Sequence, residues 1–210
     1  MTEAPRDAWA APPLADERAS RAGCALALVG LFLLGFVAVG AVLLLRAPDG
    51  GSSLGDDIRP PAGYVRLDDA ESGGGTLSEA RTADVLRTGD DVPGFEDAEL
   101  RAWGRRPGEP VRAVVVLAVQ LGSPADAVAL RVAYVDAVLD RGATPFAPPQ
   151  GLDAGAFFEP PDSAGRHAQR VAFARGSRMF VVSVVTPERD PDTAEVVRLA
   201  LDQAAAVETD

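Results

Sequence analysis

Residues 166–187 read RHAQRVAFARGSRMFVVSVVTP, and this stretch decides the fold class. Two runs rich in β-branched and aromatic residues flank Gly176 and Ser177, a two-residue spacing that favours a tight β-hairpin. Val171 and Phe173 share one face of the first run, because successive side chains of a strand point to opposite faces. The stretch therefore predicts two antiparallel strands joined by a two-residue turn.

A second pair of strands is predicted upstream of this hairpin. Residues 111–121, VRAVVVLAVQL, form the most β-like run in the chain, and residues 95–103 before them have the mixed polarity of a half-exposed strand. Pro and Gly residues between Arg106 and Pro110 predict the turn that joins the two strands. A short additional strand is expected at Phe157–Phe158.

The strongest helix pattern is SPADAVALRVAYVDAVLDRG, residues 123–142. Ser123 is the predicted N-cap, Pro124 the first helical residue and Gly142 the stop signal. The apolar residues at helical spacing, which we expect to face the sheet, are Val128, Val132, Val135 and Leu139.

Two more helices are predicted. One begins with a capping box, in which Thr76 is the N-cap and Glu79 lies three residues later, and it ends at Gly89. The other has Asp190 as its predicted N-cap and Pro191 as its first helical residue, and it closes the chain. Its predicted apolar face consists of Val197, Ala200, Leu201 and Ala204.

The order of these elements indicates an α+β fold. We expect an antiparallel sheet built from two hairpins, with two or three packed helices, preceded by a single transmembrane helix. The predicted segments are a disordered cytoplasmic tail (1–22), the transmembrane helix (23–45), a linker (46–62) and an α+β extracytoplasmic domain (63–210).

The transmembrane prediction rests on GCALALVGLFLLGFVAVGAVLLL, residues 23–45, which carry no charge. At about 1.5 Å per residue this helix spans about 34 Å, enough for a hydrocarbon core of about 30 Å. A cleaved signal has a shorter apolar core. A lipoprotein signal has its apolar stretch before the cysteine, whereas here it follows Cys24. The arginines that flank the stretch favour an outward-facing C-terminal domain; they are Arg6, Arg18 and Arg21 before it, and Arg46 and Arg59 after it.

Three motifs carry a resemblance to known proteins. They are GFEDAELRAW (94–103), the alanine-rich helix after VVVLAVQLGS (114–123), and VAFARGSRMFVVSV (171–184) followed by a helix. Over about Gly63 to Val207 the chain resembles a large group of actinobacterial extracytoplasmic domains anchored by a membrane helix or a lipid, and more loosely the PsbP/Mog1-like fold. The resemblance implies a fold and a location, and no activity.

Composition excludes several function classes. The net charge is −11, and all 20 basic residues are arginine, so chemistry that needs a lysine is absent. An acidic chain repels phosphate backbones, and nucleic acid is therefore not an expected partner. One cysteine and one histidine cannot build a zinc site of about four ligands, and we expect no metal and no cofactor.

No catalytic constellation is recognised. GSSLG, residues 51–55, fits the nucleophile-elbow pattern but lies in the predicted linker instead of between a strand and a helix. His167 is interpreted as a polar residue at the start of a strand. The weak candidates for a ligand patch are Arg101, Trp103, Arg105 and Arg106; the plainer interpretation is a half-buried tryptophan with arginines stacked over it.

These patterns favour a non-catalytic binding or accessory domain of the cell envelope, held in the membrane by one helix. Its expected partners are the lipid bilayer, through residues 23–45, and an envelope protein or a small ligand. One alternative is a hydrolase that uses carboxylates alone, which needs two carboxylates in one pocket. Another is a non-catalytic subunit of a membrane complex, which predicts an exposed apolar patch.

Overall fold

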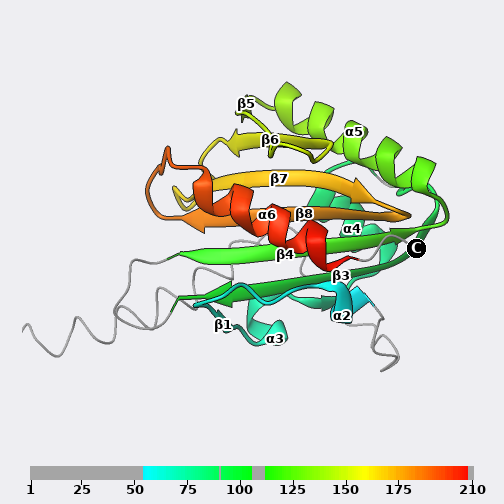
Figure 1. Ribbon diagram of the computed structural model, residues 1–210, viewed down its shortest axis with the longest axis horizontal. Helices are drawn as coiled ribbons and strands as arrows, with labels where there is room; N and C mark the ends of the chain where they lie inside the picture. The colour runs from blue at the N-terminus through cyan, green and yellow to red at the C-terminus, as the bar shows by residue number, and fades with distance from the viewer. Residues whose placement is uncertain (1–53, 90, 106–111, 208–210) are drawn as a thin grey trace, which may run out of the picture. The chain divides into compact units, whose positions relative to one another are not determined.

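The computed structural model describes residues 54–89, 91–105 and 112–207. They form an eight-stranded antiparallel sheet in the order β1-β3-β4-β8-β7-β6-β5, with β2 also paired to β3 (Figure 1). The strands are β1 (Val65–Arg66), β2 (Gly75–Thr76), β3 (Phe95–Gly104), β4 (Ala113–Leu121), β5 (Thr144–Pro145), β6 (Ala154–Glu159), β7 (His167–Arg175) and β8 (Arg178–Thr186). The helices are α2 (Leu54–Asp57), α3 (Asp69–Ser72), α4 (Glu79–Leu86), α5 (Pro124–Asp140) and α6 (Ala194–Ala206). The expected mixture of helices with an antiparallel sheet is confirmed.

Both predicted hairpins are present, and they lie side by side. Strands β7 and β8 are joined at Gly176 and Ser177, where Arg175 pairs with Arg178 and the φ of Gly176 is +55°. Strand β3 pairs with β4 along its length, while the predicted turn at 106–110 falls outside the described residues. The two hairpins form one sheet because β4 also pairs with β8.

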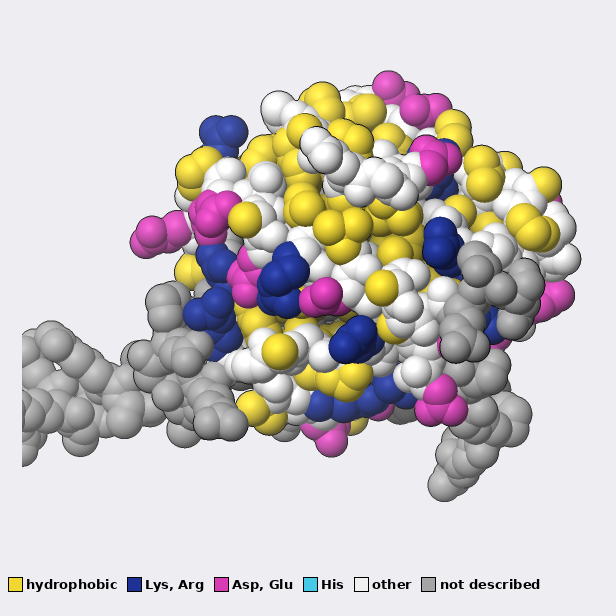
Figure 2. Space-filling model, in the orientation of Figure 1, with side chains coloured by type: hydrophobic (Ala, Val, Ile, Leu, Met, Phe, Trp, Pro, Cys, Tyr) yellow, Lys and Arg dark blue, Asp and Glu magenta, His cyan; other side chains and the backbone are white. Residues whose placement is uncertain are grey.

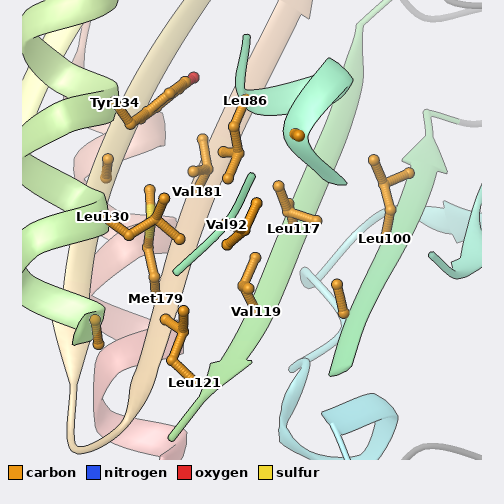
Figure 3. Close-up of a cluster of buried hydrophobic side chains, with 14 of the residues drawn as sticks. Leu86, Val92, Leu100, Leu117, Val119, Leu121, Leu130, Tyr134, Met179 and Val181 are labelled. Carbon is orange, nitrogen blue, oxygen red and sulfur yellow. The ribbon is translucent and has the colours of Figure 1, made fainter. Parts of the chain in front are cut away.

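Each face of the sheet is covered by its own helices. On one face, α4 and α5 pack over residues that include Leu117 and Val181 (Figure 3). On the other face, α2 and α6 pack over alternate residues of the same strands, such as Val116 and Val182. Figure 1 shows α6 in front of the sheet and α4 behind it. Since side chains alternate along a strand, both faces of the central strands had to be apolar to fill two layers.

Helix α5 starts as predicted, but its buried face differs. The Oγ of Ser123 accepts a hydrogen bond from the N–H of Asp126 at 3.2 Å, and Pro124 is the first helical residue. The prediction that Val128 and Val132 face the sheet is wrong, because each is 43% exposed. Apolar residues occur on most sides of this helix, so their spacing alone did not show which side packs against the sheet. The buried residues are Ala127, Leu130, Tyr134 and Val138.

The N-cap of helix α4 lies two residues after the predicted one. Thr76 is part of β2, where it pairs with Glu99 of β3, and it cannot also begin a helix. Ser78 takes that role, since its Oγ accepts the N–H of Arg81 at 3.4 Å. The helix ends before the predicted stop at Gly89.

Helix α6 begins at Ala194 instead of at the predicted Pro191. Asp190 does not cap the helix, because its carboxylate accepts the N–H of Asp192 at 2.9 Å in the loop before it. The predicted residue Leu201 is 40% exposed. The predicted residues that are buried are Ala200 and Ala204.

The folded region begins earlier than expected, inside the predicted linker. Leu54 in α2 and Ile58 just after it are each 1% exposed and pack with α6. The buried side chain of Gln203 holds this segment, because it accepts the N–H of Arg59 at 2.9 Å and donates to the carbonyl oxygen of Asp57. The linker prediction for 46–62 is therefore corrected at its C-terminal part.

Gly55 allows α2 to lie close to the sheet. A Cβ at this position would come within 2.8 Å of Oε2 of Glu99 and would collide with the guanidinium of Arg101. These two side chains form an ion pair on β3 directly beneath the helix. A glycine is needed here for close approach, and not for a special φ value.

The predicted tail and the predicted transmembrane helix, residues 1–22 and 23–45, lie outside the described residues. Among the helices of the described ranges, none has the length and apolar character that crossing a membrane requires.

Replacing Gln203 with leucine tests the attachment of α2. The change removes both hydrogen bonds and leaves two backbone groups unpaired, so the free energy of unfolding should fall by about 1–3 kcal/mol. Thermolysin, which cleaves before apolar residues, should also cut the full chain before Leu54 or Ile58 faster. The exposed Gln150 provides the control, and Gln150→Leu should change neither quantity. Unchanged cleavage in Gln203→Leu would contradict the docked position of α2.

Candidate functional site

A hollow of about 170 Å³ lies where β6, β7 and β8 end together. The antiparallel register brings its parts from distant positions: His167 pairs with Thr186, and Phe158 pairs with Gln169. Glu159, the last residue of β6, lies at the same end. The lining also includes Thr144, Pro160, Pro161, Ala168, Arg189 and Asp190.

Two carboxylates line this hollow, and both already have arginine partners. Glu159 accepts from Nη2 of Arg170 at 2.9 Å, and both side chains are largely buried. Asp190 is paired with Arg112, which stands at the start of β4. Neither carboxylate is therefore left without a counter-charge.

Arg170 is the buried cation of this region. Its Nη1 donates to the Oη of Tyr134 at 2.9 Å. Burial alone would lower the pKa of Arg170, but Tyr134 and Glu159 outweigh burial and raise it, so the guanidinium stays charged. Burial raises the pKa of Tyr134, which keeps its hydroxyl protonated. A second hollow beside Arg170 measures only about 10 Å³, room for about one water molecule and not for an organic ligand.

A second ion network surrounds Glu195 at the start of α6. Its carboxylate accepts from Tyr64 at 2.9 Å, from Arg105 at 3.4 Å and from Arg112. Burial alone would raise the pKa of Glu195, but the hydrogen bonds from Tyr64 and Arg112 and the charges of the arginines outweigh it, and the pKa is lowered. The two arginines thus balance the charges of Glu195 and Asp190.

Two basic side chains of the hollow remain for a ligand. Within the described part of the chain, no hydrogen bond or ion pair engages the side chain of Arg189 or the imidazole of His167. The guanidinium carbon of Arg189 lies 6.0 Å from the centre of the Phe158 ring. Over the same ranges there is no cluster of three or more metal-ligating side chains.

The four residues predicted as a ligand patch do not gather around an open site. Trp103 is 2% exposed and belongs to the core between the sheet and α6. Arg101 is paired with Glu99, and Arg105 takes part in the network around Glu195. Arg106 lies outside the described residues.

His167 opens a strand as predicted, but its neighbours in the hollow were not predicted. Phe158 and Arg189 belong to no motif that includes His167, and only the pairing of β6 with β7 and of β7 with β8 brings them together. The available signal was the presence of polar residues at the end of β6, at the start of β7 and at the end of β8. This signal can be interpreted only when the order of the strands in the sheet is known.

Comparisons with known proteins add little. No family model matches the chain. No curated protein matches it significantly. Among solved structures, the extracellular domain of PknH from Mycobacterium tuberculosis is similar at a TM-score of 0.38 and 12% sequence identity, over 63% of this chain and 77% of that domain. The PsbP/Mog1-like resemblance stays a prediction.

Replacing Glu159 with glutamine tests whether this carboxylate is structural. The change removes the negative partner of a buried arginine, so the free energy of unfolding should fall by roughly 1–3 kcal/mol in urea titrations of the full chain. Glu188→Gln, at an exposed glutamate, is the control and should have little effect. Catalytic carboxylates commonly cost stability. An equal or higher stability of Glu159→Gln would therefore contradict the structural role and favour acid chemistry.

Proposed function

We propose that the chain is a single-pass membrane protein whose α+β domain acts outside the cytoplasmic membrane as a non-catalytic binding or accessory domain. The membrane part of this proposal rests on the uncharged stretch 23–45 and on the arginines around it. The binding part rests on the hollow at the ends of β6, β7 and β8.

The observation that carries the binding function is the pairing of the acids in the hollow. Glu159 and Asp190 are each held by an arginine, whereas Arg189 and His167 are left toward the open space. General acid–base catalysis by two carboxylates needs one of them in an environment that shifts its pKa toward the working pH. Acids that are tied to arginines are better suited to shaping a pocket than to moving protons.

The docked helix α2 supports an accessory role close to the membrane. Eight residues separate Leu45, the end of the predicted span, from Leu54, the start of α2. Even fully extended, this connection reaches at most about 30 Å. Since α2 is bound to the core by Gln203, the side of the domain that carries α2 stays within that distance of the end of the span in this proposal. Its ligand or partner is then also found near the membrane surface.

Each alternative has one observation in its favour. A carboxylate-dependent envelope hydrolase is favoured by the presence of Glu159 and Asp190 in one hollow. A subunit of a membrane complex is favoured by exposed apolar side chains, including Val128 and Val132 on α5. Figure 2, viewed onto the face that carries α6, shows further apolar side chains gathered in the middle of this face. We prefer the binding domain because it uses the free groups of the hollow.

Protease accessibility of a C-terminal tag tests the proposal. On intact cells the tag should be removed by added protease, because the domain is proposed to face outward. Lysed cells give the total accessible signal, and a cytoplasmic protein with the same tag controls for leakage. Protection of the tag until lysis would contradict the outward orientation, and the proposed function in the cell envelope would then also be wrong.

A further inference from the structure

We propose that the hollow lined by His167, Phe158 and Arg189 binds a compact monoanionic carboxylate that carries a single ring or a short apolar body. Arg189 holds the carboxylate, His167 donates a hydrogen bond to it, and Phe158 contacts the apolar body. This inference rests on the proposed binding function, for which it names the class of ligand.

The charge balance of the hollow selects an anion. Glu159 is neutralised by Arg170, and the pair Asp190 and Glu195 is neutralised by Arg112 together with Arg105. Arg189 has no such partner within the described ranges. Arg189, an exposed residue of the loop after β8, is thus the arginine of the lining that no acid of the described ranges engages. A single positive charge matches a monoanion better than a phosphate dianion.

The size and walls of the hollow select the rest of the ligand. A volume of about 170 Å³ is well below the roughly 300 Å³ at which typical ligand pockets begin. A single ring with one carboxylate is therefore near the upper limit. Phe158, Pro160 and Pro161 give the hollow apolar lining, which suits a ring or a short hydrocarbon body.

The arrangement gives each group one role. The fork of an arginine side chain matches the two oxygens of a carboxylate, and charge-assisted hydrogen bonds of this type are the strong ones. His167 can donate from a ring nitrogen whether the imidazole is neutral or charged. The guanidinium of Arg189 lies over the Phe158 ring at 6.0 Å from its centre, so a bound molecule that reaches one of them could contact the other.

Because the chain has one histidine, its ring signals in NMR report on the hollow directly. The full chain, labelled in its histidine ring and embedded in lipid nanodiscs, is titrated with benzoate and separately with benzamide, its neutral analogue. Benzoate should shift the His167 signals with a dissociation constant in the millimolar range, and benzamide should bind at least about tenfold more weakly. Equal binding of the two probes, or no shift with benzoate, would overturn the inference.

Two arginine variants complete the test. Arg189→Gln should weaken benzoate binding at least about tenfold, since it removes the uncompensated charge. Arg175→Gln, at an exposed arginine near the opposite end of β7, should leave it unchanged. Equal weakening by both variants would show general electrostatic attraction and would also overturn the inference. If benzoate fails to bind while the C-terminal tag is removed on intact cells, the proposed ligand class is wrong and the proposed envelope location stands. If the tag is protected on intact cells, the proposed location is wrong, whether or not benzoate binds.

Discussion

The apolar character of both faces of β4 and β8 is the constraint on which the rest of the structure depends. These strands pair in the centre of the sheet, and every residue of β8 from Met179 to Thr186 is buried. Fully burying one such side chain contributes about 1.5–3 kcal/mol, so neither face can be left open to water. Two layers of helices follow from this, with α4 and α5 on one face and α2 and α6 on the other.

Charged and polar side chains lie at the ends of the strands, where the helices no longer cover the sheet. At the ends of β6, β7 and β8 the residues become charged or polar, and there the arginines meet the acids of neighbouring segments. Most of these charges cancel in pairs, because an uncompensated charge near the core is costly. The hollow thus lies at the margin of the sheet. The proposed ligand would be bound there by Arg189 and His167, the two basic lining residues that no acid of the described ranges engages.

The sequence predicted the elements better than it predicted their surroundings. The hairpin at Gly176 and the cap at Ser123 depend on local rules, and both are confirmed. The buried face of α5 could not be chosen from spacing, because valine and alanine occur on most of its sides. The docking of α2 and the hollow depend on contacts between residues far apart in the chain, such as Gln203 with Arg59, for which no local pattern exists.

Hydrogen exchange of the full chain, measured peptide by peptide, tests the two-faced sheet most directly. Amides in the interior of a core exchange only through large-scale unfolding, whereas edges and poorly attached segments open locally. The account predicts the slowest exchange in β4 and β8, slower exchange in β8 than in the outer strand β6, and protection of residues 54–58 well above that of a free peptide. Exchange in β8 as fast as in β6, with residues 54–58 unprotected, would contradict a core that is covered on both faces.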